Sequence, residues 1–185
     1  SECLVGSEMC IRDRNGDAFP FPSWEADQDL NSAMQNSVNW YFQAIDSQLG
    51  INRVQEFLNK IEYGNQTTSS NLDLYWSDFS LKISPLEQVT LLKKFNTNEF
   101  HLNSQNVFSV KNAIKIASTP NGNFYGKTGT GRVNGQDING WFIGYVETSD
   151  NSYYFATNIQ SDSNATGKKA FEITSDILKK LHIWN

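Results

Sequence analysis

The sequence has few of the residues that build metal centres and disulfide frameworks. Its 185 residues include two cysteines, Cys3 and Cys10, and two histidines, His101 and His182. The histidines are too few and too far apart for a metal site, and both cysteines lie near the start, so we expect no metal. Cys3 and Cys10 can pair in an oxidising compartment, but two cysteines alone do not establish that compartment.

Long apolar runs and an excess of positive charge are also missing. No stretch approaches the run of about 18 apolar residues that a membrane-spanning helix needs. The 15 lysines and arginines stand against 20 aspartates and glutamates, and no basic stripe is present, which argues against nucleic-acid binding. With 38% hydrophobic and 19% charged residues, the composition is typical of a globular protein with a real core.

The first 14 residues, SECLVGSEMCIRDR, differ from the rest of the chain because they hold both cysteines and show no clean hydrophobic period. We expect residues 1–14 to be a non-native or disordered leader, and the folded domain to lie within residues 15–185.

Hydrophobic periodicity predicts helices first and strands later in the chain. Helices are expected over residues 27–49, 52–61, 103–117 and 165–181, and another is expected to begin at Ser84-Pro85. A break within residues 27–49 places Ser37 at a cap position. Glu87 closes a capping box with Ser84, and Pro85 suits the first turn of that helix. Three strands are expected over residues 123–130, 140–147 and 153–160, with Asn134-Gly135 in the first connection. This is an α+β pattern. A three-stranded sheet is small for this much helix, so we expect further strands to be missing.

Residues 124–131, Phe-Tyr-Gly-Lys-Thr-Gly-Thr-Gly, bring a cation, two hydroxyls and bare backbone together. The glycines allow a ligand to approach the strand edge closely. Lys127 supplies positive charge, and the hydroxyls of Thr128 and Thr130 share one strand face. The set suits a small anionic ligand laid along the edge. On this run alone, a hairpin strand with incidental glycines and an exposed lysine remains the alternative.

Three short motifs occur in the order and rough spacing of the penicillin-recognising serine proteins: Ser37-Val38-Asn39, Tyr63-Gly64-Asn65 and Lys127-Thr128-Gly129. More narrowly, the chain resembles class D β-lactamases and the extracellular sensor domains of BlaR/MecR-type β-lactam receptors. Longer matches to this group are residues 28–42, Trp76 with 81–84 and 87–89, and 139–146. The resemblance covers about residues 19–181 and implies a β-lactamase/transpeptidase-like fold, an antiparallel sheet flanked by helices.

The resemblance also implies roles for single residues. Ser37 would be a proton-relay hydroxyl, and Lys127 would add positive potential, so these two are the catalytic candidates. Thr128 and Thr130, with Gly129 between them, would hold the ligand carboxylate, and the Thr130 backbone N–H would be one oxyanion donor. Trp76 would shield the family's catalytic lysine. Plain alternatives remain open: a helix cap for Ser37 and core packing for Trp76.

Two departures from the family pattern matter. The family's nucleophile lies in a Ser-x-x-Lys motif upstream of Ser37, but no lysine in this chain has a serine three positions before it. Without nucleophile and base the remaining residues cannot acylate, so we expect a partial domain that lacks its first strands and nucleophile helix. The second departure is Asn39, where many class D enzymes carry an apolar residue and the sensors carry asparagine. An amide there would hydrogen-bond the lysine or the acyl adduct.

Three functions are compatible with the resemblance. The first is penicillin binding by the sensor domain of a membrane-bound signal transducer, acylated by β-lactam in the full-length protein. The second is a secreted class D β-lactamase, and the third is an inactive fragment without its nucleophile. Whether the chain is an enzyme stays open. We expect a β-lactam as ligand or substrate, no cofactor and an extracytoplasmic location, with membrane attachment through the missing N-terminal segments if the protein is a receptor.

Overall fold

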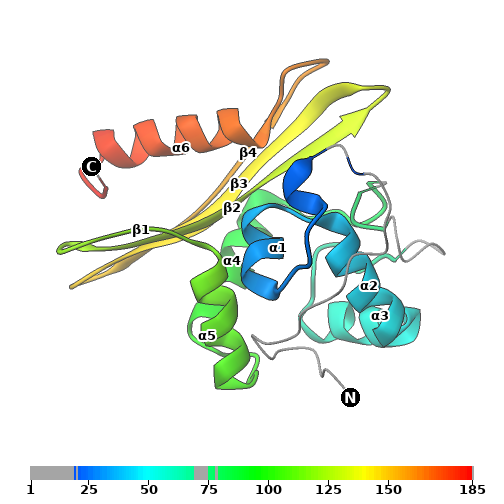
Figure 1. The fold of residues 1–185 in the computed structure, drawn as a ribbon. Helices are drawn as coiled ribbons and strands as arrows, with labels where there is room; N and C mark the ends of the chain where they lie inside the picture. Colours follow the sequence, from blue (N-terminus) through cyan, green and yellow to red (C-terminus); the bar gives the residue numbers. More distant parts are fainter. Residues whose placement is uncertain (1–18, 20, 69–74, 78, 185) are drawn as a thin grey trace. The chain divides into compact units, whose positions relative to one another are not determined.

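The computed structural model describes residues 19, 21–68, 75–77 and 79–184 (Figure 1). The chain divides into two compact units, Ser1–Lys82 with Phe95–Ile114, and Ile83–Lys94 with Lys115–Asn185. The expected leader, residues 1–14, lies outside the described residues. No helix in the described part of the chain is long and apolar enough to cross a bilayer.

The first unit is helical. Its elements are the 3-10 helix η1 (Pro22–Trp24) and the α-helices α1 (Leu30–Gln35), α2 (Asn39–Leu49), α3 (Ile51–Lys60) and α5 (Ser104–Ala113). α1 begins with a capping box, because the Asp29 carboxylate accepts from the Ser32 N–H and the Ser32 hydroxyl accepts from the Asp29 N–H. Two buried clusters form the core of the first unit. One contains Ala33, Val38 and Tyr41, and the other contains Val54, Leu58 and Tyr75.

The second unit holds a four-stranded antiparallel sheet in the order β1-β2-β3-β4. The strands are β1 (Lys115–Thr119), β2 (Gly122–Val133), β3 (Gln136–Thr148) and β4 (Ser152–Gln160). Helix α6 (Gly167–Lys180) lies along one face of the sheet, as Figure 1 shows. The core between them contains Phe124, Phe142, Val146, Ala170 and Leu178. The α+β class and the antiparallel sheet with helices are therefore confirmed.

Two predicted local signals are confirmed. Asn134 and Gly135 connect β2 to β3 with φ of 48° and 78°, as a tight hairpin turn requires. Helix α4 (Pro85–Asn96) begins at the expected capping box: the Glu87 carboxylate accepts from the Ser84 N–H at 2.8 Å, and the Ser84 Oγ accepts from the Glu87 N–H at 3.2 Å.

One predicted helix was too long, and a strand was missed at its end. The helix expected over residues 103–117 ends at Ala113, and residues 115–119 instead form β1, so the sheet has four strands rather than three. Helical periodicity was overridden by pairing with residues 122–125, which follow a short turn and offer β1 a partner strand. The break expected within residues 27–49 is present, since α1 ends at Gln35 and α2 begins at Asn39.

Candidate functional site

Ser37 lies in a turn that closes the end of α1. The Val38 N–H donates to the Ala33 carbonyl at 2.8 Å, and the Ser37 N–H donates to the Met34 carbonyl at 3.3 Å. This pair of bonds, with Ser37 at a φ of 53°, is a Schellman motif in which Ser37 takes the left-handed position. The hydrophobic contact typical of that motif is present, because Ala33 and Val38 are both fully buried in one cluster.

The prediction that Ser37 sits at a cap position was wrong. Val38 is the N-cap residue of α2, and no side chain makes a cap hydrogen bond there. Glycine is the usual residue at the left-handed position of a Schellman motif, because a Cβ costs about 1–2 kcal/mol in that conformation. Ser37 is half-buried and carries its Cβ at this left-handed position. Asn39 follows two residues later as the first residue of α2 and is exposed.

Trp76 packs in the core of the first unit. It is half-buried against the cluster of Val54, Leu58 and Tyr75, so the packing alternative weighed for it describes its position. The Tyr75 hydroxyl donates to the Asp46 carboxylate at 3.3 Å. Burial, and then the charge of Asp46, raise the pKa of Tyr75 well above its ordinary value, so the phenol keeps its proton.

Asn65 of the Tyr63-Gly64-Asn65 motif joins two loops. Its Nδ2 donates to the Ser80 carbonyl at 2.8 Å, and its Oδ1 accepts from the Lys82 N–H at 2.9 Å. The Asn65 N–H in turn donates to the Lys82 carbonyl at 2.9 Å. These bonds tie the loop that contains Asn65 to the loop at residues 80–82.

Lys127, Thr128, Gly129 and Thr130 lie consecutively on β2, with one strand edge open. They pair with Ile143, Phe142, Trp141 and Gly140 of β3. On the other side, β1 pairs with β2 only from Gly122 to Tyr125. In the described residues, β2 therefore has no strand partner on this side beyond Tyr125. This is the open edge that the glycine-rich run predicted.

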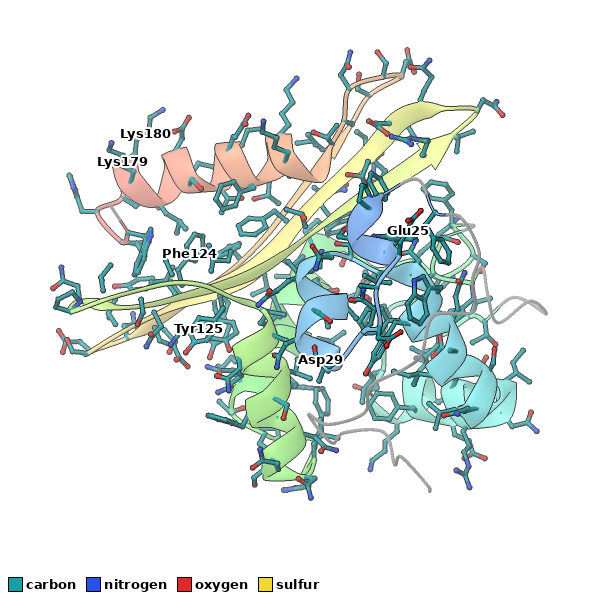
Figure 2. The ribbon with its side chains drawn as sticks, viewed as in Figure 1. Glu25, Asp29, Phe124, Tyr125, Lys179 and Lys180 are labelled. Carbon is teal, nitrogen blue, oxygen red and sulfur yellow. The ribbon has the colours of Figure 1, made fainter. Side chains whose placement is uncertain are left out.

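The two threonine side chains share the sheet face that α6 covers. Phe124 lies on the α6 side of the sheet and Tyr125 on the opposite side, as Figure 2 shows. Alternation then carries Thr128 and Thr130 to the α6 side. The Gly167 N–H donates to the Thr130 Oγ1 at 2.9 Å, and a Cβ added to Gly167 would lie 2.9 Å from the Thr128 Cβ. The expectation that both hydroxyls share one strand face is confirmed.

Gly167, the first residue of α6, was missed by the sequence analysis. A Cβ there would lie 2.6 Å from the Gly129 carbonyl oxygen and 2.9 Å from its nitrogen, so only glycine allows α6 to approach β2 this closely. Gly140 of β3 also allows a close approach, because a Cβ added there would overlap the carbonyl oxygen of Thr166, directly before α6. The Thr166-Gly167 pair at a predicted helix start was the signal available, with Thr166 capping the Lys169 N–H.

The Lys127 ammonium folds back along the open edge. Its Nζ donates to the Thr128 carbonyl oxygen at 2.9 Å, which places that carbonyl outside the β2–β3 ladder. The N–H and C=O of one strand residue point the same way, and residues two apart repeat the direction, so the Thr130 N–H also faces the open edge. Burial lowers the pKa of Lys127 from its ordinary value, which makes its charge costly to keep.

The candidate residues therefore form two groups, each within one unit. Ser37, Asn39 and Trp76 belong to the first unit, and the β2 run from Lys127 to Thr130 belongs to the second. The open edge of β2 offers a lysine, backbone donors and threonine hydroxyls, a set suited to a carboxylate and to a developing oxyanion. No group of three His, Cys, Asp or Glu side chains in the described ranges is arranged to hold a metal ion.

Comparison with known proteins places the chain in a family. Residues 11–179 match the Penicillin binding protein transpeptidase domain. The chain belongs to this family, which confirms the resemblance drawn from the three motifs.

The similar proteins include a regulatory protein, a methicillin resistance protein and a probable beta-lactamase. The chain is 46% identical over 170 residues to the Regulatory protein BlaR1 of Bacillus licheniformis, covering 92% of this chain and 28% of that protein. It is 44% identical over 165 residues to the Methicillin resistance mecR1 protein of Staphylococcus aureus, covering 89% and 28%. It is 38% identical over 176 residues to the Probable beta-lactamase YbxI of Bacillus subtilis, covering 95% and 64%.

A solved structure agrees at the level of the fold. The C-terminal domain of the Bacillus licheniformis BlaR penicillin-receptor superposes with a TM-score of 0.90 at 44% identity, covering 95% of this chain and 71% of that one. The chain thus spans 28% of the length of the BlaR1 and mecR1 proteins and 71% of the solved domain.

Proposed function

We propose that this chain is the ligand-binding part of a β-lactam sensor domain of the BlaR/MecR type. The observation that carries β-lactam binding is the open edge of β2, where Lys127, two threonines and bare backbone lie together. A β-lactam carries a carboxylate and a carbonyl that becomes an oxyanion on attack, and this edge presents donors suited to both. In the proposal Thr128 and Thr130 bind the carboxylate, Gly129 admits the ligand, and the Thr130 N–H faces the oxyanion.

Ser37 is the proposed proton relay. Acylation forms a bond from a serine Oγ to the lactam carbonyl carbon, breaks the lactam C–N bond and delivers a proton to the ring nitrogen. A hydroxyl accepts and donates at once, so Ser37 can pass that proton on. Lys127 is proposed to supply positive potential for a ligand held at the β2 edge. The left-handed serine at a glycine position supports this role. Two further residues complete the proposed set. Asn39 hydrogen-bonds the acyl adduct, and Trp76 shields the lysine of the family's Ser-x-x-Lys motif.

The attacking serine and its lysine base are not among the 185 residues. A Ser-x-x-Lys pair elsewhere in the gene product is therefore part of the proposal, as is membrane attachment through segments that this sequence does not contain. In this account the domain faces the outside of the cytoplasmic membrane.

A sensor is favoured over a hydrolase by two observations. Identity is 46% and 44% to the BlaR1 and mecR1 proteins and 38% to the probable β-lactamase. Asn39 is the amide-bearing residue that the sensor resemblance carries at this place of the motif. A class D β-lactamase is the second candidate, because the probable β-lactamase aligns over 95% of the chain.

Covalent labelling tests the proposal. The full-length gene product and the 185-residue chain are each incubated with a fluorescent penicillin and separated by denaturing electrophoresis. We expect a labelled full-length product and an unlabelled 185-residue chain. A full-length product that takes no label would refute β-lactam acylation. A labelled short chain would refute the requirement for a separate serine and lysine. Rapid loss of the label from the full-length product would favour the hydrolase.

A further inference from the structure

A short segment before α1 is folded against the turn that holds Ser37. This segment, Phe21–Gln28, is called the strap; Glu25 and Asp29 mark its C-terminal half and the start of α1 in Figure 2. The indole Nε1 of Trp24 donates to the Asn36 carbonyl at 3.0 Å, directly before Ser37. The indole Nε1 of Trp40, in the first turn of α2, donates to the Trp24 carbonyl at 3.0 Å. Trp24 thus joins the end of α1 to the start of α2.

The strap holds Trp24 in place from its other side. The buried Gln28 donates its Nε2 to the Ser23 carbonyl at 2.8 Å and to the Ala26 carbonyl at 2.9 Å. The Trp24 N–H donates to the Phe21 carbonyl at 2.9 Å, and the two rings pack at 5.4 Å between centroids. The strap is therefore closed by internal hydrogen bonds, and its tryptophan reaches the turn from a fixed position.

The bond from Trp24 acts on the peptide plane that sets the direction of Ser37. The Asn36 carbonyl and the Ser37 N–H belong to one planar peptide unit. Its carbonyl end accepts from Trp24, while its N–H end makes a long 3.3 Å bond to Met34. The carbonyl lies past the last turn of α1, where helix carbonyls lack intrahelical partners. The Trp24 bond is thus the shorter of the two that fix this plane, and the Cα–Cβ direction of Ser37 follows from it.

We propose that Trp24 is a positioning residue for Ser37. Its indole N–H fixes the peptide before Ser37, so the hydroxyl keeps one orientation toward the reacting ligand despite the strained left-handed backbone. This inference rests on the proposed function, because it gives Ser37 a reaction to serve. Proton transfer depends steeply on donor–acceptor geometry, and loss of this bond lowers the rate of acylation more than it lowers ligand affinity.

The test removes the N–H and keeps the ring. In the full-length gene product, Trp24 is replaced site-specifically by 3-benzothienylalanine, whose sulfur stands where the indole N–H was. A second protein carries 5-fluorotryptophan at the same position, which restores the N–H. The matched control carries 3-benzothienylalanine in place of Trp184, which packs against the core of the second unit. Acylation by a fluorescent penicillin is followed by stopped flow to separate the acylation rate constant from the dissociation constant.

We expect the sulfur analogue at position 24 to lower the acylation rate constant about tenfold with an unchanged dissociation constant. The 5-fluorotryptophan protein and the Trp184 control should keep the unsubstituted rate. An acylation rate within about twofold of the unsubstituted protein would overturn the inference while leaving the proposed function intact. A rate loss matched by an equal loss of affinity would also overturn it, because that pattern reports a general disturbance. Absence of acylation in the unsubstituted protein would refute the proposed function itself.

Discussion

Replacing Ser37 by glycine should separate stability from function. Ser37 has a φ of 53°, where a side chain bearing a Cβ costs about 1–2 kcal/mol and glycine costs none. The greater freedom of glycine in the unfolded chain opposes this by about 0.4–1 kcal/mol. Ser37→Gly should therefore leave the free energy of unfolding unchanged or raise it by up to about 1.5 kcal/mol. Urea unfolding followed by circular dichroism measures the change.

Ser37→Ala is the matched control, because it removes the same hydroxyl but keeps the Cβ in the left-handed conformation. We expect the glycine variant to be more stable than the alanine variant by about 1 kcal/mol. In the full-length gene product both variants should lose most of their acylation rate with fluorescent penicillin. A glycine variant that is less stable than the alanine variant would contradict the strain argument. Retained acylation in both would contradict the relay role of Ser37.

Four further substitutions, one of them a control, test other parts of the molecule. Lys127→Met should stabilise the fold at neutral pH and weaken β-lactam binding. Burial lowers the pKa of Lys127 in the folded chain below its ordinary 10.5, so the unfolded chain binds more protons at pH values between the folded and unfolded pKa, and the free energy of unfolding rises with pH in that range. A pH series of urea melts should show this rise for the unsubstituted protein and not for the variant. Gly167→Ala should lower the free energy of unfolding by about 1–3 kcal/mol in thermal melts, because the added Cβ meets the backbone of Gly129. Gly129→Ala is the control and should change stability little, because its Cβ meets only a side-chain carbon at 3.7 Å. Equal losses in the two variants would contradict the argument that α6 approaches β2 too closely for a side chain at position 167. Asn65→Ala should cost about 1–3 kcal/mol in urea unfolding by removing both side-chain bonds to the loop at residues 80–82, and an unchanged midpoint would show that the loop holds without them.

The sequence was most informative where local chemistry decides local structure. The capping box at Ser84 and Glu87 and the hairpin turn at Asn134-Gly135 depend on residues within four positions of one another, and both were predicted correctly. The glycine-rich run predicted the open edge of β2 because alternation and bare backbone are visible in the sequence. Local rules of this kind do not depend on the partner that a segment finds.

Errors arose where a distant partner or a finer backbone geometry decides. Residues 115–117 were assigned to a helix because the pairing of β1 with residues 122–125 is a tertiary choice between strands. Ser37 was placed at a cap because its type suits one, while the structure uses the position as the left-handed end of α1. Gly167 was missed because the need for glycine comes from β2, 37 residues before it, where Thr130 accepts its N–H.

The hydrogen bonds that Trp24 and Trp40 make around Ser37 could not be predicted from the sequence either. Tryptophan is usually a core residue, so the sequence alone sets neither Trp24 nor Trp40 apart from the other aromatics. Their indole N–H groups connect the strap to the two helices around Ser37. A hydrogen bond across 12 residues of chain leaves no periodic signal, so only the folded backbone shows it.

The lifetime of the acyl adduct distinguishes a β-lactam sensor from a β-lactamase. The full-length gene product is treated with benzylpenicillin, free drug is removed, and intact-protein mass spectrometry follows the adduct over time. A β-lactam sensor should keep the mass of one whole drug molecule on a single serine as long as the protein stays folded. Return to the unmodified mass with release of opened drug would contradict the sensor account and establish a hydrolase. A protein that never gains the drug mass would contradict β-lactam binding through acylation altogether.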